Sequence, residues 1–553
     1  MRARSFVFAL LFIAAPAALA QRIHADDPIR RDADDLPVAM PRTREVASAY
    51  DALRYSLARA KGQPARAADV NTLDEVPDSS WFTNRMSASP MPVEELVRGP
   101  ATVPGPDVSR PWIVINGKIG GVTPGFTVRD ARGDVYFVKV DPKDWPHLAT
   151  AVDVIGALFF HAFGYWVPEN FIARIRPEDL RLGPEARFRG VNEAPRPMKD
   201  EDLRLILDAC PREPDGRIRV VASRELPGRS VGPFLYEGTR SDDPNDIFAH
   251  EDRRELRALR VFCAWLNHVD SSSHNTLDTY VGAPGRGHVR HNLIDWNGIL
   301  GSGSISPREP WEGNEYVLPW SAMLKSALSA GIWDRPWRRV SYAAYPETGL
   351  LEADFFRPER WKPYYPNPAH ERMTADDALW ATRIVMGFSD EAVRALVHAG
   401  EYSDPAAEAH LADTLIRRRD KVVAYYLNLI DPLTDFRCDK SDLTFRNLGV
   451  EAGLAEWAEY DYTWFRFDNR SASLEPLGLS GVSADQRFEV PARRGPFLMA
   501  RIRTRAAGRP AWRSSVDVYV GRGRGVVGVD RDAGAPTIRA DSQLASVAAS
   551  ARR

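Results

Sequence analysis

The stretch ALRVFCAWLNHVDSSSHNTLDTYVGAPGRGHVRHNLIDWNGILG, residues 258–301, is the part of the chain that says most about its fold. It begins with a run of helical spacing whose apolar face is Leu259, Phe262, Cys263 and Leu266. His268-Val269-Asp270 follows, and Asn275 stands five residues further on. A hairpin is expected next, and a final apolar strand leads into Asp295-Trp296-Asn297-Gly298. Two carboxylates and one carboxamide are therefore expected on loops held by a helix and by strands.

Two interpretations of these loops are open. Asp, Ser and Asn form ordinary turns because their side chains bond nearby backbone groups, and Asp-x-Asn-Gly can close a hairpin. The order H-x-D-x-x-x-x-N, followed by a second Asp after a strand, is also that of a phosphoryl-transfer centre. In such a centre Asp270 accepts a hydroxyl proton, while Asn275 and Asp295 hold divalent ions, Mg²⁺ or Mn²⁺. The tandem arrangement favours this second interpretation.

A glycine-rich hairpin lies upstream. Residues 113–128 are expected to form strand, turn and strand, and residues 135–140 a third strand with Lys139 among apolar neighbours. The turn region contains Gly117, Lys118, Gly120, Gly121 and Gly125. Glycines let backbone N–H groups approach phosphates, and a lysine ammonium pairs with phosphates as a point charge. A lone lysine on a strand is usually solvated, but its apolar neighbours favour an inward role for Lys139.

A helix is expected over residues 148–164. Its apolar residues at helical spacing are Val152, Ile155, Leu158 and Phe159. Asp153 is the only acid within it and hence the candidate partner for the Lys139 ammonium. The alternative is an exposed Asp153 near the helix N-terminus, where the helix dipole favours acids.

In these motifs the chain resembles the protein-kinase-like fold. It is more similar to the atypical branches, namely the HipA-type bacterial serine kinases, the spore-coat kinases and the secretory-pathway kinases, than to eukaryotic signalling kinases. The resemblance covers about residues 111–430. It implies an α+β, bilobal fold with a β-rich N-lobe and a helical C-lobe.

The resemblance also implies ATP as the nucleotide and assigns roles to residues. The phosphates would be bound by Gly117, Lys118, Gly120, Gly121, Lys139 and Asp153, with Asn275 nearby. Asp270 would be the catalytic base, and Asn275 and Asp295 would be the metal ligands. Val269 stands in place of the usual Arg, Trp296-Asn297 replaces the Phe of D-F-G, and no A-P-E segment is evident. Regulation through an activation loop is therefore not expected.

Composition sets broad limits on partners. The 73 basic and 75 acidic side chains give a net charge of −2, so no general attraction to nucleic acid or anionic lipid is expected, and any electrostatic recognition must be local. A length of 553 residues implies more than one domain, and 44% hydrophobic residues suffice for a sizeable core. No transmembrane segment is expected in the mature chain.

The first twenty residues indicate export. Arg2 and Arg4 precede an apolar run at residues 6–15, and Ala18-Leu19-Ala20 supplies a small-x-small cleavage pattern. A buried structural helix is the alternative. The expected product is a secreted or periplasmic protein that begins at about Gln21.

Six regions are expected along the chain. They are a signal peptide (1–20), an N-terminal extension (21–110), a β-rich N-lobe (111–225), a helical C-lobe with the catalytic centre (226–440), a small β-rich accessory domain (441–530) and a disordered tail (531–553). The extension should contain one amphipathic helix near residues 44–61, with Ala47, Tyr50, Leu53 and Leu57 on its apolar face.

Other groupings allow alternatives. Cys263 is expected to be a buried thiol, while Cys210 and Cys438 either pair or stay free. A transition-metal site is conceivable at His268, Asp270, His274, His288 and His291, although their spacing matches no known zinc pattern. Trp320, Trp333, Trp337 and Trp361 would line a carbohydrate groove or pack in the core.

Two classes of function follow. The first is an exported ATP-dependent phosphotransferase acting on a hydroxyl of a protein, glycan or small molecule. The second is an inactive pseudokinase that serves as a binding or scaffold protein of the cell envelope. The acceptor, the metal and the oligomeric state stay open at this point.

Overall fold

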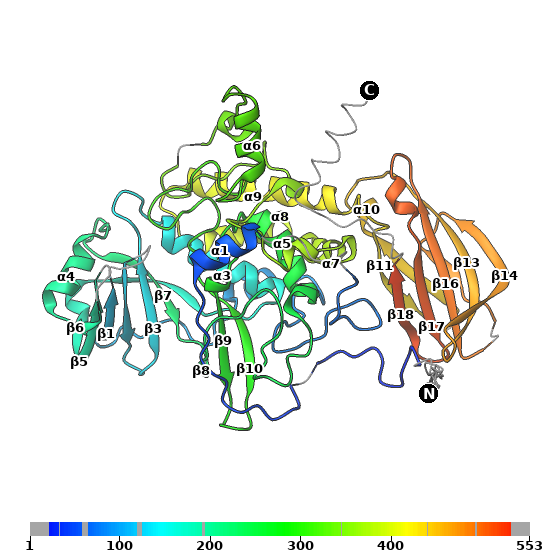
Figure 1. Ribbon diagram of the computed structural model, residues 1–553, viewed down its shortest axis with the longest axis horizontal. Coiled ribbons are helices and arrows are strands. Elements are labelled where there is room, and N and C mark those ends of the chain that lie inside the picture. The colour runs from blue at the N-terminus through cyan, green and yellow to red at the C-terminus, as the bar shows by residue number, and fades with distance from the viewer. Residues whose placement is uncertain are drawn as a thin grey trace, which may run out of the picture.

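The computed structural model describes residues 21–32, 34–57, 65–118, 124–190, 194–343, 345–439, 441–492 and 495–531. The expected signal peptide and the tail from residue 532 onward lie outside the described residues. The protein is a mixed α+β structure. A seven-stranded sheet and a C-terminal pair of sheets lie on opposite sides of a helical body (Figure 1).

The seven-stranded sheet has the order β4-β7-β3-β2-β1-β5-β6. Its strands are β1 (Trp112–Lys118), β2 (Gly125–Arg129), β3 (Val135–Val140), β4 (Asn170–Ile175), β5 (Leu180–Arg189), β6 (Arg196–Pro197) and β7 (Ile218–Arg224). Neighbours pair antiparallel except β1 and β5, which are parallel. Helix α4 (Asp200–Asp208) covers one end of the sheet with Leu203, Ile206 and Leu207. The three strands expected around the glycine-rich turn are present.

The helical body includes the two helices that the sequence predicted over residues 148–164 and before His268. Its helices are α2 (Val93–Arg98), α3 (Leu148–Phe163), α5 (Arg254–Leu266), α7 (Ala375–Met386), α8 (Asp390–His398) and α9 (Pro405–Tyr426). The predicted apolar faces of α3 and α5 are buried in one common core. The helix starts have local causes, since Thr374 and Asp377 form a capping box on α7 and Ser389 caps α8.

A three-stranded sheet carries the loops of the decisive stretch. It consists of β8 (Arg229–Ser230), β9 (Thr276–Val281) and β10 (His288–Leu293). The hairpin expected between Asn275 and Asp295 is present, with Leu293 opposite Thr276. Helix α6 (Trp320–Leu328) follows and projects from the body (Figure 1).

The C-terminal region is rich in strands, as the sequence predicted, but its first strand starts before residue 441. The strands are β11 (Leu433–Cys438), β12 (Asp442–Asn447), β13 (Glu459–Asp468), β14 (Ser473–Ser483), β15 (Arg487–Glu489), β16 (Phe497–Arg505), β17 (Val516–Gly521) and β18 (Gly525–Arg531), with α10 (Leu448–Glu451) between β12 and β13. They form a sheet β11-β12-β15 and a sheet β14-β13-β16-β17-β18. Arg531, expected to belong to the tail, ends β18.

The N-terminal extension is an integral part of the fold. Residues Val76, Trp81, Phe82, Met86 and Leu96 belong to the core of the helical body. Further apolar residues pack elsewhere, Val38 against the β9–β10 hairpin and Ile23 against the C-terminal sheet. The extension therefore joins parts of the molecule that are far apart in sequence.

The orientation expected for the helix of the extension is wrong. In α1 (Ser48–Leu57) the expected apolar face is outward, and Tyr50, Leu53 and Leu57 are exposed. Asp51 and Tyr55 are the buried residues instead. The apolar spacing was misleading because the side of α1 that packs on the protein carries Asp51 and the Tyr55 ring, which stacks on Tyr365.

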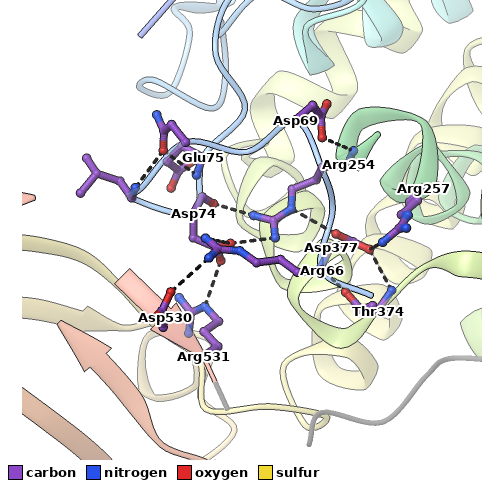
Figure 2. Close-up of polar contacts among 12 residues, drawn as sticks. Arg66, Asp69, Asp74, Glu75, Arg254, Arg257, Thr374, Asp377, Asp530 and Arg531 are labelled. Carbon is purple, nitrogen blue, oxygen red and sulfur yellow. Dashed lines mark hydrogen bonds and ion pairs between the residues drawn. The ribbon is translucent and has the colours of Figure 1, made fainter. Parts of the chain in front are cut away.

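An ion network links the extension, the helical body and β18 (Figure 2). The buried guanidinium of Arg254 donates to Asp74 Oδ1 (2.9 Å) and to Asp377 Oδ1 (3.1 Å). Asp74 also pairs with Arg66 (3.2 Å) and with Arg531 of β18 (3.5 Å). One carboxylate thus contacts cations from three separate parts of the chain.

The structure also shows whether the cysteines are paired and whether the tryptophans of residues 320–361 are buried. Cys210, Cys263 and Cys438 are all free, and Cys210 lies in the core of the seven-stranded sheet while Cys438 ends β11. Among the tryptophans Trp361 is buried, whereas Trp320 is half exposed. Within the described ranges, each helix is too short or too polar to cross a bilayer.

Candidate functional site

Lys139 lies at the centre of a compact group of charges. It stands on β3 opposite Gly125 of β2 and Val221 of β7. Its Nζ lies 3.0 Å from Asp153 Oδ2 and 3.1 Å from Asp295 Oδ1. The lysine is therefore turned toward α3 and the turn after β10, and the pairing with Asp153 suggested by the sequence is present. The exposed alternative for Asp153 is wrong, since its side chain is 1% exposed.

A carboxylate that sequence reasoning missed positions α3 for this pairing. Asp141 follows β3 directly, and its Oδ1 accepts hydrogen bonds from the backbone N–H groups of Ala149 and Thr150, both at 2.9 Å. Its Oδ2 accepts from the Thr150 hydroxyl at 2.7 Å. Two N–H groups at the start of α3 are thereby satisfied. The same side chain fastens the end of the Lys139 strand to the helix that carries Asp153.

Gly156 is the second residue that was missed. A Cβ at this position would lie 2.6 Å from Trp296 Cβ and 2.7 Å from Ile299 Cδ1. Because such contacts are too short, only glycine lets α3 approach the Asp295 turn this closely. The signal in the sequence was a glycine three residues after Asp153 inside an otherwise regular helix.

The turn after β10 presents Asp295 to the lysine. Asp295 has a left-handed backbone (φ 63°), a conformation that Asp tolerates better than most residues. The next N–H, that of Trp296, donates to Asp153 Oδ1 at 2.9 Å. The Trp296 ring is fully buried and stacks on Phe160 with ring centroids 4.2 Å apart. Trp296 thus anchors the turn to α3, and Asp153 binds both the turn and Lys139.

The charges of Lys139, Asp153 and Asp295 shift one another's pKa values. Burial works to lower the pKa of Lys139, but Asp153 and Asp295 together raise it above its usual value. Burial raises the pKa of Asp153. Burial opposes ionisation of Asp295 as well, yet the Lys139 charge and hydrogen bond hold the pKa of Asp295 below the usual value. Asp295, whose side chain is 44% exposed, is therefore the ionised and accessible carboxylate.

The loop of Asp270 and Asn275 is fastened to the same turn. Asn267 ends α5 in a left-handed conformation, and its N–H donates to Cys263 O. The Asn275 amide Nδ2 donates to the Asp270 carbonyl at 2.7 Å, which leaves the amide oxygen as an acceptor. The Asn275 carbonyl accepts from the Ile294 N–H at 2.9 Å. This backbone link ties the Asn275 loop to the residue just before Asp295, so the two candidate metal ligands are held in neighbouring segments.

Asp270 lies partly buried beside this loop. Burial raises the pKa of Asp270, against hydrogen bonds from Ser272 and Asn275 and the charge of Arg308. A carboxylate with a raised pKa is a better proton acceptor than an ordinary surface Asp. His268, two residues earlier, is buried, and desolvation lowers its pKa to about 3, so its ring is neutral at physiological pH.

Arg308 is a third residue that the sequence did not single out. Its guanidinium is buried, Nε donates to Ser302 O at 3.2 Å, and Nη2 donates to Gly298 O. A Cβ on Gly298 would lie 3.1 Å from Arg308 Nη2 and 3.6 Å from Asp270 Cβ. Arg308 is therefore a fixed positive charge close to Asp270. It lies in an irregular segment without periodic pattern, so no sequence signal indicated its position.

The glycine-rich hairpin is described only in part. Gly120 and Gly121 lie outside the described residues. Gly117 and Gly125 lie within β1 and β2, where an added Cβ would overlap Met198 Cε and Val138 O respectively. Close packing therefore explains why residues 117 and 125 are glycines. Lys118, at the end of β1, is exposed, and its charge contributes to lowering the pKa of Asp295.

Helix α1 covers the loop that holds Asp270. The Tyr55 ring stacks on Tyr365 with centroids 6.2 Å apart, and the N–H of the preceding Tyr364 donates to the Val269 carbonyl beside Asp270 at 2.9 Å. Burial raises the pKa of Asp51, against the charges of Arg54 and His274. The buried side of α1 therefore consists of Asp51 and Tyr55 and lies next to the Asp270 loop.

The residues present fit Mg²⁺ or Mn²⁺, which prefer oxygen ligands, better than Zn²⁺, which prefers nitrogen and sulfur ligands. Asp295 and the Asn275 amide oxygen are oxygen ligands, and Mg²⁺ uses one or two carboxylates together with substrate phosphates. Over the described part of the chain, no group of three or more His, Cys, Asp or Glu side chains converges as a metal site. His291 instead bonds Asp278 Oδ1 at 2.7 Å and stacks on Trp81 with ring centroids 3.5 Å apart.

Comparisons with known proteins add little to this geometry. No protein-family model matches the chain, and no curated protein matches it. Among solved structures the chain is similar to the Helicobacter pylori proinflammatory kinase CtkA, with 13% identity and a TM-score of 0.29. The match covers 56% of this chain and 94% of that chain. A likeness this weak carries no argument about function, so function must be argued from the site.

Proposed function

We propose that the protein is an exported ATP-dependent phosphotransferase with a bilobal, kinase-like arrangement. The β-rich N-lobe would be the seven-stranded sheet, and the helical body would be the C-lobe. The observation that carries the proposal is the convergence of Lys139, Asp153 and Asp295 beside the loop of Asp270 and Asn275. These five residues come from four separate segments of the chain, and each has the chemistry that phosphoryl transfer requires.

Each residue has a distinct role in the proposal. Lys139, held by Asp153, pairs with the phosphates of ATP. Asp295 and the amide oxygen of Asn275 would hold Mg²⁺ or Mn²⁺, which neutralises charge on the phosphate oxygens when bound. Asp270 accepts the proton of the acceptor hydroxyl as the oxygen attacks the γ-phosphorus, and ADP leaves.

Nucleotide binding is the first test. With Mg²⁺ present, calorimetry should detect ATP binding to the mature chain, and Asp295→Ala should abolish its metal dependence. Lys139→Ala should weaken binding because it removes a charge paired with the phosphates in the ground state. Asp468→Asn, a change to an exposed residue at the end of β13, is the matched control and should bind as the wild type does. Unchanged ATP affinity in Asp295→Ala would refute the assigned role.

Transfer is the second test. Asp270→Asn should keep nucleotide binding but lower transfer of labelled γ-phosphate by roughly 10² to 10⁴, the usual contribution of a positioned base. Protein, glycan and small-molecule acceptors should be offered, with autophosphorylation as a further readout. Equal transfer rates in wild type and Asp270→Asn would count against Asp270 as the base.

A pseudokinase scaffold is the second candidate, and the cover formed by α1 favours it. Asp51 and Tyr55 of α1 are buried, and the Tyr55 ring stacks on Tyr365, whose neighbour Tyr364 bonds the backbone of Val269, so α1 lies next to the Asp270 loop. A wild type that binds ATP but phosphorylates no acceptor class, with Lys139→Ala and Asp270→Asn behaving alike, would decide for the scaffold.

Export is a separate part of the proposal. It is supported by the charged start, the apolar run and the Ala18-Leu19-Ala20 pattern of the sequence. N-terminal sequencing of the protein from the secreted or periplasmic fraction should begin at about Gln21. Recovery of a chain that still starts with Met1 would contradict cleavage.

A further inference from the structure

Helix α6 presents an apolar face to solvent. Of its nine residues only Ala322 is buried, and the helix projects from the helical body at the edge of the molecule (Figure 1). Its exposed apolar residues are Trp320 (51%), Met323 (48%), Leu324 (60%) and Leu328 (81%), and Ile332 (86%) follows in the next turn of chain. This spacing places them on one side of the helix.

An apolar helix face of this kind is normally buried against another surface. A helix of nine residues is too short to be stable in water through its backbone alone, and helices of soluble proteins bury their apolar face. Contiguous exposed apolar residues with a polar rim mark an interaction surface. In the described part of the chain, Ala322 is the one residue of α6 that is packed away from solvent.

The charges around this face are mostly positive. Residues 317–340, here named the α6 segment, contain Lys325, Arg335, Arg338 and Arg339 but only one acidic residue, Asp334. Arg335 pairs with Glu315 and Arg339 with Asp334, so the positive charge available to a partner is that of Lys325 and Arg338. Lys325 Nζ lies 5.4 Å from the centre of the Trp333 ring, and the Arg338 guanidinium lies 5.7 Å from that of Trp337. The α6 segment therefore contains two cation–indole pairs in addition to its exposed apolar side chains.

We propose that the α6 segment docks the protein on an anionic lipid surface. Trp320, Leu324 and Leu328 would enter the boundary between headgroups and acyl chains, where indole rings are favoured. Lys325 and Arg338 would meet the anionic headgroups. A second copy of the chain is a poorer occupant, because a two-fold interface through α6 would bring the same basic residues of both copies together. The proposal does not depend on phosphoryl transfer.

The test is co-sedimentation of the mature full-length protein with vesicles. One set contains phosphatidylcholine alone and the other equal parts of phosphatidylcholine and phosphatidylglycerol. Leu324→Glu combined with Leu328→Glu should lower partitioning onto the anionic vesicles by about tenfold or more, since two buried leucines are lost. The control combines Leu479→Glu with Val482→Glu on β14, where both residues are similarly exposed (48% and 53%), and should bind as the wild type does.

A charge variant separates the two contributions. Lys325→Glu combined with Arg338→Glu should remove the preference for anionic vesicles, by about tenfold or more, because each basic residue near the surface contributes about 1 kcal/mol. Circular dichroism and urea unfolding should match the control, so that a loss of binding is not a loss of fold.

Three outcomes would overturn the proposal. The first is no wild-type binding to the anionic vesicles, and the second is an equal loss of binding in the β14 control. The third is a concentration-dependent dimer in the absence of lipid that the α6 variants abolish, which would make a second copy the occupant. Binding that requires anionic lipid and is lost in both α6 variants supports the proposal.

Discussion

Arg254 is the side chain whose removal should most clearly show how the parts of the molecule are held together. It is fully buried, and its guanidinium bonds Asp74 of the extension and Asp377 of α7 (Figure 2). Arg254→Met keeps most of the volume but leaves both carboxylates without this partner. Removing one member of a buried ion pair costs about 3–5 kcal/mol. Because Asp74 keeps Arg66 at 3.2 Å and Asp377 keeps Arg257 at 3.6 Å, a loss near the lower limit, about 3 kcal/mol, is expected.

The matched control is Arg446→Met. Arg446 is also paired with two carboxylates, Asp435 at 2.7 Å and Glu451, but its side chain is 53% exposed. Exposed pairs contribute about 0–1 kcal/mol. Urea unfolding followed by tryptophan fluorescence measures both free energies of unfolding. If Arg254→Met loses no more stability than Arg446→Met, the idea that the buried network joins the extension to the helical body is wrong.

Three further predictions concern single residues. Gly156→Ala should cost about 1–3 kcal/mol of unfolding free energy, because its Cβ would overlap Trp296; an unchanged urea midpoint would contradict the close approach. Arg308→Met should shift the acid limb of any transferase activity to higher pH, since the guanidinium lowers the pKa of Asp270 and the base must be ionised; an unmoved pH profile would exclude this influence. Burial raises the pKa of Asp431 to about 8. The folded state therefore keeps a proton that the unfolded chain releases near the ordinary pKa of 3.8. The free energy of unfolding consequently falls as pH rises from 3.8 to about 8. Asp431→Asn should therefore gain stability relative to wild type between about pH 5 and pH 8 in urea unfolding, and a constant difference would refute the raised pKa.

The parts of the site that could be predicted from sequence are those that depend on local pattern. Helical spacing indicated the buried faces of α3 and α5, and turn residues indicated the β9–β10 hairpin. The order of the motifs indicated Lys139, Asp153 and Asp295 as site residues, and in the structure Lys139 forms ion pairs with both carboxylates. The roles of these residues in catalysis stay predictions.

The parts that failed depend on contacts between distant segments. The apolar spacing of α1 predicted a buried face, but Asp51 and Tyr55 turn inward, and the Tyr55 ring stacks on Tyr365 of a distant segment. Arg308 comes from an irregular segment, and only the fold places it beside Asp270. Neither relation leaves a periodic signal in the sequence.

The short acid on α3 is consistent with the rest of the site. An Asp carboxylate reaches less far than that of a Glu, so α3 must lie close to Lys139 for the two side chains to pair. Asp141 fastens the start of α3 to the end of β3, and Gly156 lets the helix pack against Trp296 without a side chain between them. The Trp296 N–H then reaches Asp153 Oδ1 at 2.9 Å, while Oδ2 keeps Lys139 at 3.0 Å. Trp296 at this turn and Asp153 on α3 therefore belong to one packing arrangement, which the longer side chain of a Glu at position 153 would crowd.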